Sequence, residues 1–109
     1  MDKEIMKGSI DIIILSIICS KDTYGYEIAK EIKEKSSFSY SIGEGTLYPA
    51  LKRLEKKQFI KSYWQSANLI GKRKYYQITE LGKKKLGEKL EQWGKITSLI
   101  NILGGEINE

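Results

Sequence analysis

Residues 45–55 have the sequence Gly-Thr-Leu-Tyr-Pro-Ala-Leu-Lys-Arg-Leu-Glu. Leu47, Leu51 and Leu54 recur within this stretch at spacings of four and three, which is the spacing of one helix face. The stretch therefore predicts an amphipathic helix, within residues 43–57, whose leucines pack into a core.

Pro49 indicates where this helix begins, because proline fits without strain only in the first turn. We therefore expect the helix to start near Gly45 or Thr46. Its outer face would carry polar and basic side chains, namely Thr46, Tyr48, Lys52, Arg53 and Lys56.

Two further helices are predicted before it. Residues 3–19 are apolar on nearly every side, which predicts a buried helix covered by the body of the chain and by another element, such as a second chain. The next helix ends near Lys35, and either Asp22 or Thr23 can cap its start. Its apolar face would carry Tyr24, Ile28 and Ile32.

After Gln58 the apolar pattern changes to a period of two, which is typical of strands. Residues 60–65 and 73–78 alternate in this way, with a loop at 66–72 between them. The pattern predicts a β-hairpin whose second arm is basic.

The last helix is expected to begin after a Thr79 cap and to end near Leu103, before the glycines at 104–105. Its apolar side chains recur at nearly heptad spacing, as in helices that pair. Their positions are Leu86, Leu90, Trp93, Thr97, Ile100 and Leu103. One small core cannot cover so long a helix, so we predict a homodimer. Its interface would include Leu86, Leu90, Trp93, Ile100 and Leu103.

Charge is concentrated in the middle of the chain. The 109 residues, enough for one small domain, include 19 basic and 14 acidic side chains. Residues 52–85 hold 11 of the basic and 2 of the acidic ones, a net charge of +9, with Tyr63, Trp64, Tyr75 and Tyr76 among them. Such a segment indicates a polyanion partner, and the alternative is a solvated lysine-rich surface.

The composition excludes several classes of function. The chain has no histidine and one cysteine, Cys19, which removes histidine-dependent catalysis, multi-cysteine zinc sites and internal disulfides. We therefore predict no enzyme activity, no metal and no cofactor. The N-terminus carries two acidic residues, Asp2 and Glu4, where a signal peptide has only positive charge, and the apolar run at 10–19 is too short to span a membrane. We expect a cytoplasmic protein that does not contact membranes.

Together these elements predict a mainly α fold with a small β-hairpin, a winged helix-turn-helix followed by a long C-terminal dimerisation helix. We assign residues 1–78 to the DNA-binding domain and 79–109 to the dimerisation helix and a short tail, within one compact unit. The predicted DNA-binding residues are Thr46, Tyr48, Lys52, Arg53, Lys72, Arg73 and Lys74. Two-fold symmetry would place two recognition helices ~34 Å apart on a pseudo-palindromic, double-stranded operator. The alternative is a winged-helix module that contacts protein and not DNA.

Three segments, taken in order, resemble the PadR family of transcriptional regulators: residues 24–28 (YGYEI), 45–55 and 71–82 (GKRKYYQITELG). The resemblance covers most of the chain and implies a homodimeric repressor whose first and last helices form the dimer interface. The chain is similar to short members that lack a separate helical C-terminal domain. It departs from the family pattern at Gln58, where glycine is common, and in the loop at 66–70, which contains the apolar Leu69 and Ile70.

The resemblance also implies a ligand site. In small multidrug-responsive members, a tryptophan matching Trp93 pairs with its mate and stacks flat aromatic ligands, although Trp93 is equally well explained as an interface anchor. An effector, if one exists, would be a flat, apolar or cationic aromatic compound between the two Trp93 side chains. Ile12, Thr97 and Asp11 would line the site, with Asp11 either pairing with the ligand or facing solvent.

Several residues have simpler structural explanations. We expect Tyr24 and Tyr26 to pack in the helix-turn-helix core rather than to touch DNA. Tyr75 and Tyr76 alternate, so one should point inward and the other outward. Cys19 is expected to be a small buried apolar residue.

Overall fold

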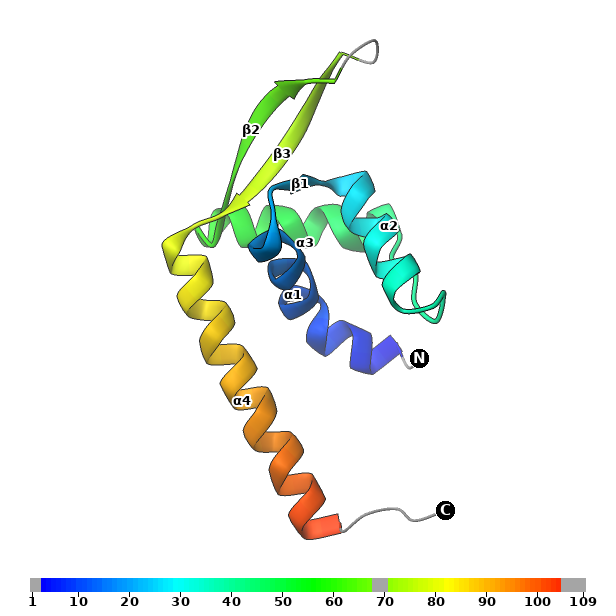
Figure 1. The fold of residues 1–109 in the computed structure, drawn as a ribbon, viewed down its shortest axis with the longest axis vertical. Coiled ribbons are helices and arrows are strands. Elements are labelled where there is room, and N and C mark those ends of the chain that lie inside the picture. Colours follow the sequence, from blue (N-terminus) through cyan, green and yellow to red (C-terminus); the bar gives the residue numbers. More distant parts are fainter. Residues whose placement is uncertain (1–2, 68–70, 105–109) are drawn as a thin grey trace.

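The computed structural model describes residues 3–67 and 71–104, with side chains from residue 9 onward. The elements in chain order are α1 (Lys3–Ser20), β1 (Thr23–Tyr24), α2 (Gly25–Lys35), α3 (Glu44–Lys56), β2 (Ile60–Ser66), β3 (Lys72–Ile78) and α4 (Glu80–Gly104). The first three helices pack together, the hairpin of β2 and β3 rises from them, and α4 extends in the opposite direction (Figure 1). The predicted fold class is confirmed. Leu69, Ile70 and Gly105 lie outside the described residues.

The core lies where α1, α2 and α3 meet the base of the hairpin. The leucine face of α3 is buried as predicted, with Leu47, Leu51 and Leu54 almost without exposed surface. Its main partners are the aliphatic side chains of Ile14, Leu15, Ile18, Ile28, Ile60 and Ile78. Burial of these apolar side chains is the main force that holds the three helices together.

The prediction that Asp22 or Thr23 caps α2 is wrong. Thr23 and Tyr24 form a short strand, β1, that pairs with β3 and gives a three-stranded antiparallel sheet of order β1-β3-β2. Tyr24 is the N-cap residue, with an extended backbone and no capping side-chain bond. Thr23 is committed to the sheet, and the carboxylate of Asp22 accepts a hydrogen bond from Tyr63 instead.

The expected start of α3 is also wrong. The helix begins at Glu44, after Gly43 as N-cap, so Pro49 lies in the second turn rather than the first. The missing amide of Pro49 leaves the Gly45 carbonyl without its helical donor. Because both residues lie on the exposed face of α3, water can take the place of that donor.

Gln58 ends α3 in a left-handed conformation, with φ of 67°. The Gln58 amide donates to the Glu55 carbonyl, and the Phe59 amide donates to the Leu54 carbonyl. This is the Schellman arrangement, in which glycine is the usual residue at the left-handed position. The departure from the family pattern therefore has a local cost, since a side chain is disfavoured there.

The predicted Thr79 cap is confirmed, because its hydroxyl oxygen accepts a hydrogen bond from the Gly82 amide at 2.9 Å. The same hydroxyl donates to the Gln58 carbonyl at 2.7 Å. Gly82 is itself constrained, because a Cβ there would collide with the Phe59 carbonyl oxygen. These contacts fix the direction in which α4 leaves the body.

Two predictions of burial fail. Cys19 is exposed, because it shares one flank of α1 with the exposed Ser16 and Ser20. Tyr26 is 65% exposed, because it lies outside the buried face of α2 that carries Ile28 and Ile32.

Candidate nucleic-acid interface

The outer face of α3 carries the side chains predicted for a recognition helix. Thr46, Tyr48 and Lys52 are exposed, whereas the leucines on the other side of the helix are buried. Tyr48 packs against the start of α2, where a Cβ on Gly25 would stand 2.5 Å from the Tyr48 hydroxyl. Glycine at position 25 therefore lets the two helices approach closely and leaves room for the Tyr48 ring.

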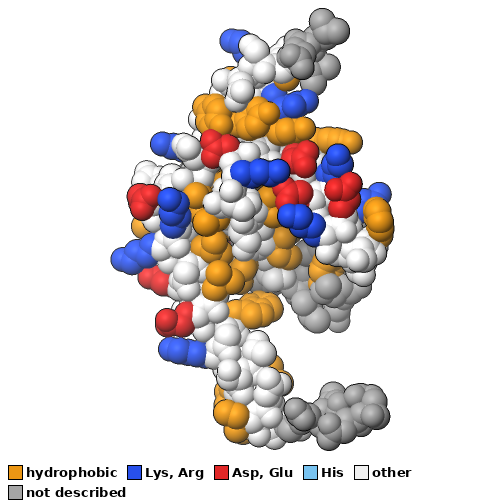
Figure 2. Space-filling model, in the orientation of Figure 1, with side chains coloured by type: hydrophobic (Ala, Val, Ile, Leu, Met, Phe, Trp, Pro, Cys, Tyr) orange, Lys and Arg blue, Asp and Glu red, His pale blue; other side chains and the backbone are white. Residues whose placement is uncertain are grey.

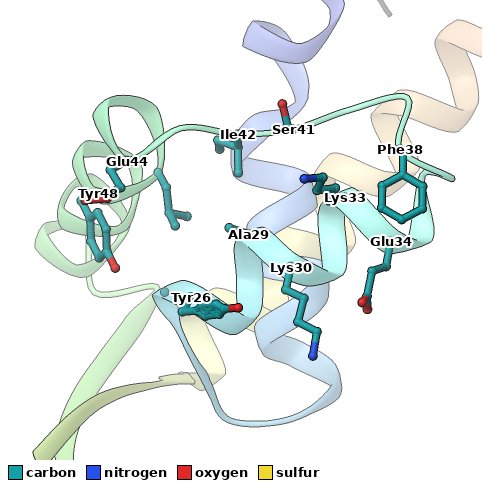
Figure 3. Close-up of a pocket in the computed structure, with 12 residues that line it drawn as sticks. Tyr26, Ala29, Lys30, Lys33, Glu34, Phe38, Ser41, Ile42, Glu44 and Tyr48 are labelled. Atoms are coloured by element: carbon teal, nitrogen blue, oxygen red, sulfur yellow. The ribbon is translucent and has the colours of Figure 1, made fainter. Parts of the chain in front are cut away.

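Two adjoining hollows lie beside this face. The larger, of about 620 Å³, is lined by α2, the following loop and the start of α3. Tyr26 and Tyr48 stand near one end of it and Phe38 at the other, with Lys30 and Lys33 along the α2 side (Figure 3). The smaller, of about 430 Å³, lies between the start of α2 and the wing formed by β2 and β3. Its lining residues are Tyr24, Gly25, Tyr26, Tyr48, Trp64, Arg73, Lys74 and Tyr76.

Gly25, Tyr26 and Tyr48 line both hollows, so α2, α3 and the wing form one continuous concave surface. Sequence reasoning did not assign Tyr26, Lys30, Lys33 or Trp64 to this surface. The spacing of four and three among the first three was an available signal, since it places them on one face of α2. The sequence places Trp64 only within the basic segment of residues 52–85, and the pairing of β2 with β3, which sets Trp64 opposite Lys74, brings it to this surface.

The three basic residues of the wing have different surroundings. Lys72 is exposed at the start of β3. The Arg73 guanidinium lies 4.0 Å above the centre of the Tyr24 ring, and the Lys74 ammonium lies 3.9 Å from a carboxylate oxygen of Glu55. The Arg73 guanidinium is therefore positioned before any partner binds, which lowers the entropy cost of a further contact.

A stack of tyrosines fixes the base of the wing. Residues 63 and 75 face each other across β2 and β3, and their rings are stacked with centroids 5.7 Å apart. Tyr24 packs edge-on against Tyr75 at 5.3 Å. Tyr76 points to the other face and is buried, which confirms the predicted alternation.

The Tyr63 hydroxyl donates a 2.6 Å hydrogen bond to the carboxylate of Asp22. This bond is the main reason that the pKa of Tyr63 lies above its ordinary value of 10.0, because the neutral phenol is the donor. It also ties the wing to the segment before β1, so the wing is anchored at its base by a directional contact as well as by packing.

Arg53, which the sequence predicts as a DNA-binding residue, has a partner inside the chain. Its guanidinium donates a 2.7 Å hydrogen bond to the carboxylate of Asp11 on α1. Asp11 was expected either to pair with an effector or to face solvent. A cationic ligand would therefore have to compete with Arg53 for this carboxylate.

The residues predicted for the dimer interface and the effector site differ in how far they are exposed. Leu86 belongs to the core of the chain itself, with 7% of its surface exposed. Leu90, Trp93, Ile100 and Leu103 project from the outer part of α4 and are exposed, and Figure 2 shows hydrophobic side chains at the surface there. Thr97 is exposed on the same helix and donates to the Trp93 carbonyl, whereas Ile12 is partly buried against the core.

Two classes of site are missing from the part of the chain that the structure describes. Within residues 3–67 and 71–104, no group of three or more cysteine, aspartate or glutamate side chains is placed to hold a metal ion. No helix in these two ranges is both long enough and apolar enough to cross a membrane.

Comparison with known proteins agrees with this arrangement. Residues 14–88 match the model of the transcriptional regulator PadR-like family. A transcriptional regulator from Clostridium thermocellum is 41% identical, with a TM-score of 0.86 over 94% of this chain and 97% of that one. A PadR family transcription regulator from Clostridium difficile is 46% identical, with a TM-score of 0.79 over 89% of this chain and 99% of that one.

A more distant structure, of Bacillus subtilis PadR in complex with operator DNA, is 27% identical. Its TM-score is 0.67 over 74% of this chain and 46% of that one. The family match covers most of the described chain, and the two nearer structures align over almost their whole length. The chain is a member of the PadR-like family of transcriptional regulators.

Proposed function

We propose that this chain is a homodimeric repressor that binds a specific operator sequence through the outer face of α3. The observation that carries the proposal is the concave surface of α2, α3 and the wing, on which the Tyr48 ring packs against Gly25 and the Arg73 guanidinium lies over the Tyr24 ring. Membership of a family of transcriptional regulators sets enzyme activity aside.

In this proposal α3 enters the major groove, which is wide enough for one helix and displays a distinct pattern of donors and acceptors for each base pair. Thr46, Tyr48 and Lys52 reach the base edges and nearby phosphates. The wing lies along the adjacent backbone, where Lys72, Arg73 and Lys74 neutralise phosphates. The proposed target is double-stranded DNA, and a cytoplasmic location is part of the proposal.

The exposed apolar face of α4 supports the dimer. Trp93 is 47% exposed and Ile100 is 61% exposed in the single chain, and Leu90 and Leu103 continue the same seam. A second copy would bury this seam and place two α3 helices ~34 Å apart on a pseudo-palindromic operator.

The effector site is part of the same proposal. Trp93 is 47% exposed on the seam, so two copies would bring a pair of indole rings to the dimer axis. A flat aromatic or cationic compound between them would bind more tightly to one dimer shape than to another, and only that difference in affinity can shift the protein from its DNA. Quenching of Trp93 fluorescence by planar dyes in a Trp64→Phe background tests this, and dyes that change neither the fluorescence nor operator affinity would leave Trp93 as an anchor only.

DNA binding is tested by titrating the protein with the DNA upstream of its own gene. The titration is repeated at several salt concentrations, with unrelated DNA as competitor. Specific binding that weakens steeply with salt is expected. Lys52→Ala should weaken binding to the operator, whereas Lys95→Ala, a matched change on α4 away from the seam, should not. Neutralising Lys72, Arg73 and Lys74 together should reduce the salt slope by about 2.7, or 0.9 for each phosphate contact.

Wild-type protein that binds no upstream DNA at low salt would refute the proposal. The alternative, a winged-helix module that contacts only protein, would then be favoured. Wild-type affinity in Thr46→Ala, Tyr48→Ala and Lys52→Ala would refute the assignment of α3 as the recognition helix.

A further inference from the structure

Arg53 and Glu55 lie on opposite flanks of α3. Since each residue turns an α-helix by about 100°, these two positions are about 200° apart around the helix axis. Lys52 and Lys56 project between them, away from the buried leucines. The outer face of the recognition helix is therefore bordered by one residue on each side, and both make contacts with other elements.

On one flank, Arg53 donates to Asp11 of α1 at 2.7 Å. On the other flank, the Ser62 hydroxyl donates to one oxygen of Glu55 at 2.7 Å, and the Lys74 ammonium lies 3.9 Å from the other oxygen. We call these five residues the polar clamp: Asp11, Arg53, Glu55, Ser62 and Lys74. They connect α3 to α1 on one side and to the wing on the other.

The core contacts of α3 constrain its rotation less directionally than these polar contacts do. Leu47, Leu51 and Leu54 pack against aliphatic side chains, and such contacts have little directional preference. Charge-assisted hydrogen bonds are directional and fix an angle as well as a distance. A recognition surface works only if its side chains are held within about 10–20° of the productive orientation.

We propose that Asp11 and Glu55 are positioning residues that hold α3 at one rotation about its own axis. Asp11 acts through Arg53, and Glu55 acts through Ser62 and Lys74. The proposal rests on the proposed function, since it concerns how α3 reads DNA. It also gives Arg53 a role different from the direct DNA contact that the sequence predicts, because its guanidinium already binds Asp11.

A charge-reversal experiment separates these two roles of Arg53. The variants are Asp11→Asn, Arg53→Gln, and the reversed pair in which Asp11→Arg is combined with Arg53→Asp. The control is a second reversed pair, Glu91→Lys with Lys95→Glu, which exchanges the charges of an exposed ion pair on α4. Each protein is titrated with operator DNA and with unrelated DNA over a range of salt, after circular dichroism has shown that it is folded.

If Arg53 is part of the clamp, each single variant loses roughly three- to tenfold in operator affinity, which is the lower end of the couplings found between residues in contact. Affinity for unrelated DNA stays within about twofold, and the salt slope is unchanged, because no phosphate contact is lost. The reversed pair regains most of the lost operator affinity, and the α4 control matches wild type.

Three results would overturn the proposal. A salt slope lower by about 0.9 in Arg53→Gln, with the reversed pair weaker than either single variant, would make Arg53 a direct phosphate contact. Equal losses for operator and unrelated DNA would make the pair a general structural contact. Wild-type protein that binds no operator would refute the proposed function itself, an outcome distinct from the first two.

Discussion

Helices α3 and α4 are both amphipathic, but only α3 has its apolar face covered by the rest of the chain. The apolar face of α3 is buried against α1 and α2, whereas the side chains of α4 are exposed from Leu90 to its last residue. The winged helix-turn-helix body is therefore held by its own core, whereas the outer part of α4 leaves apolar side chains exposed, as the proposed dimer would explain. Changes in α3 should therefore affect folding, and changes in α4 should affect assembly.

The largest effect is expected in the core of α3. Leu51→Ala removes a fully buried side chain and should lower the free energy of unfolding by about 2–5 kcal/mol. Ile102→Ala removes a similar apolar side chain from an exposed position of α4 and should cost less than about 0.5 kcal/mol. Urea unfolding measures both free energies, and similar losses in the two variants would contradict the difference between the buried face of α3 and the exposed part of α4.

The next effect concerns assembly. Ile100→Asp places a charge on the predicted seam of α4 and should weaken the dimer by about 2 kcal/mol or more, equivalent to roughly thirtyfold in the dissociation constant. Light scattering over a range of concentrations measures this shift, and circular dichroism should show an unchanged body. Lys95→Ala, which lies off the seam, is the control. A dimer of unchanged strength in Ile100→Asp would place the interface elsewhere.

A smaller effect is expected at the end of α3. Gln58→Gly should raise the free energy of unfolding by about 1 kcal/mol, because glycine adopts the left-handed conformation of this residue without a steric penalty. Gln58→Ala keeps the penalty and should give no gain. A loss of stability in the glycine variant would show that the Gln58 side chain contributes more than its backbone strain costs.

The smallest effect is a dependence on pH at the base of the wing. Because the hydrogen bond to Asp22 raises the pKa of Tyr63, the bond contributes fully below the unfolded value of 10.0 and is lost as the pH rises through the higher folded value. Tyr63→Phe should therefore be less stable than wild type by a constant amount between pH 7 and 9. The difference should shrink above pH 10, and a difference that grows there would contradict the assignment of this bond.

Sequence reasoning predicted the fold because the periodic patterns are strong where the core is strong. The leucines of α3, the alternation in the wing and the Thr79 cap are local signals, and the structure confirms each of them. Sequence reasoning missed β1, because two residues are too few to show a period and their pairing with β3 depends on tertiary contact. It placed α3 too late, because an exposed proline is tolerated in the second turn.

In the candidate site, too, the sequence predicts what depends on local periodicity and misses what depends on tertiary contacts. The exposed positions of Thr46, Tyr48 and Lys52 follow from helix periodicity. The surroundings of Arg53 do not follow from helix periodicity. Its partner Asp11 is 42 positions away in the sequence and contacts Arg53 only when α1 packs on α3. The spacing of Lys30 and Lys33 places them on one face of α2, but this pattern does not show which neighbouring surface the face adjoins, and α3 meets it only in the fold.

We propose that one part of this chain binds DNA and the other brings two chains together. Light scattering of the protein alone and with its operator duplex tests this most directly. For the protein alone at micromolar concentration, we expect twice the 12.5 kDa mass of the chain. With the operator duplex, we expect two chains bound to each duplex. A mass of one chain alone, together with one chain bound to each duplex, would contradict it.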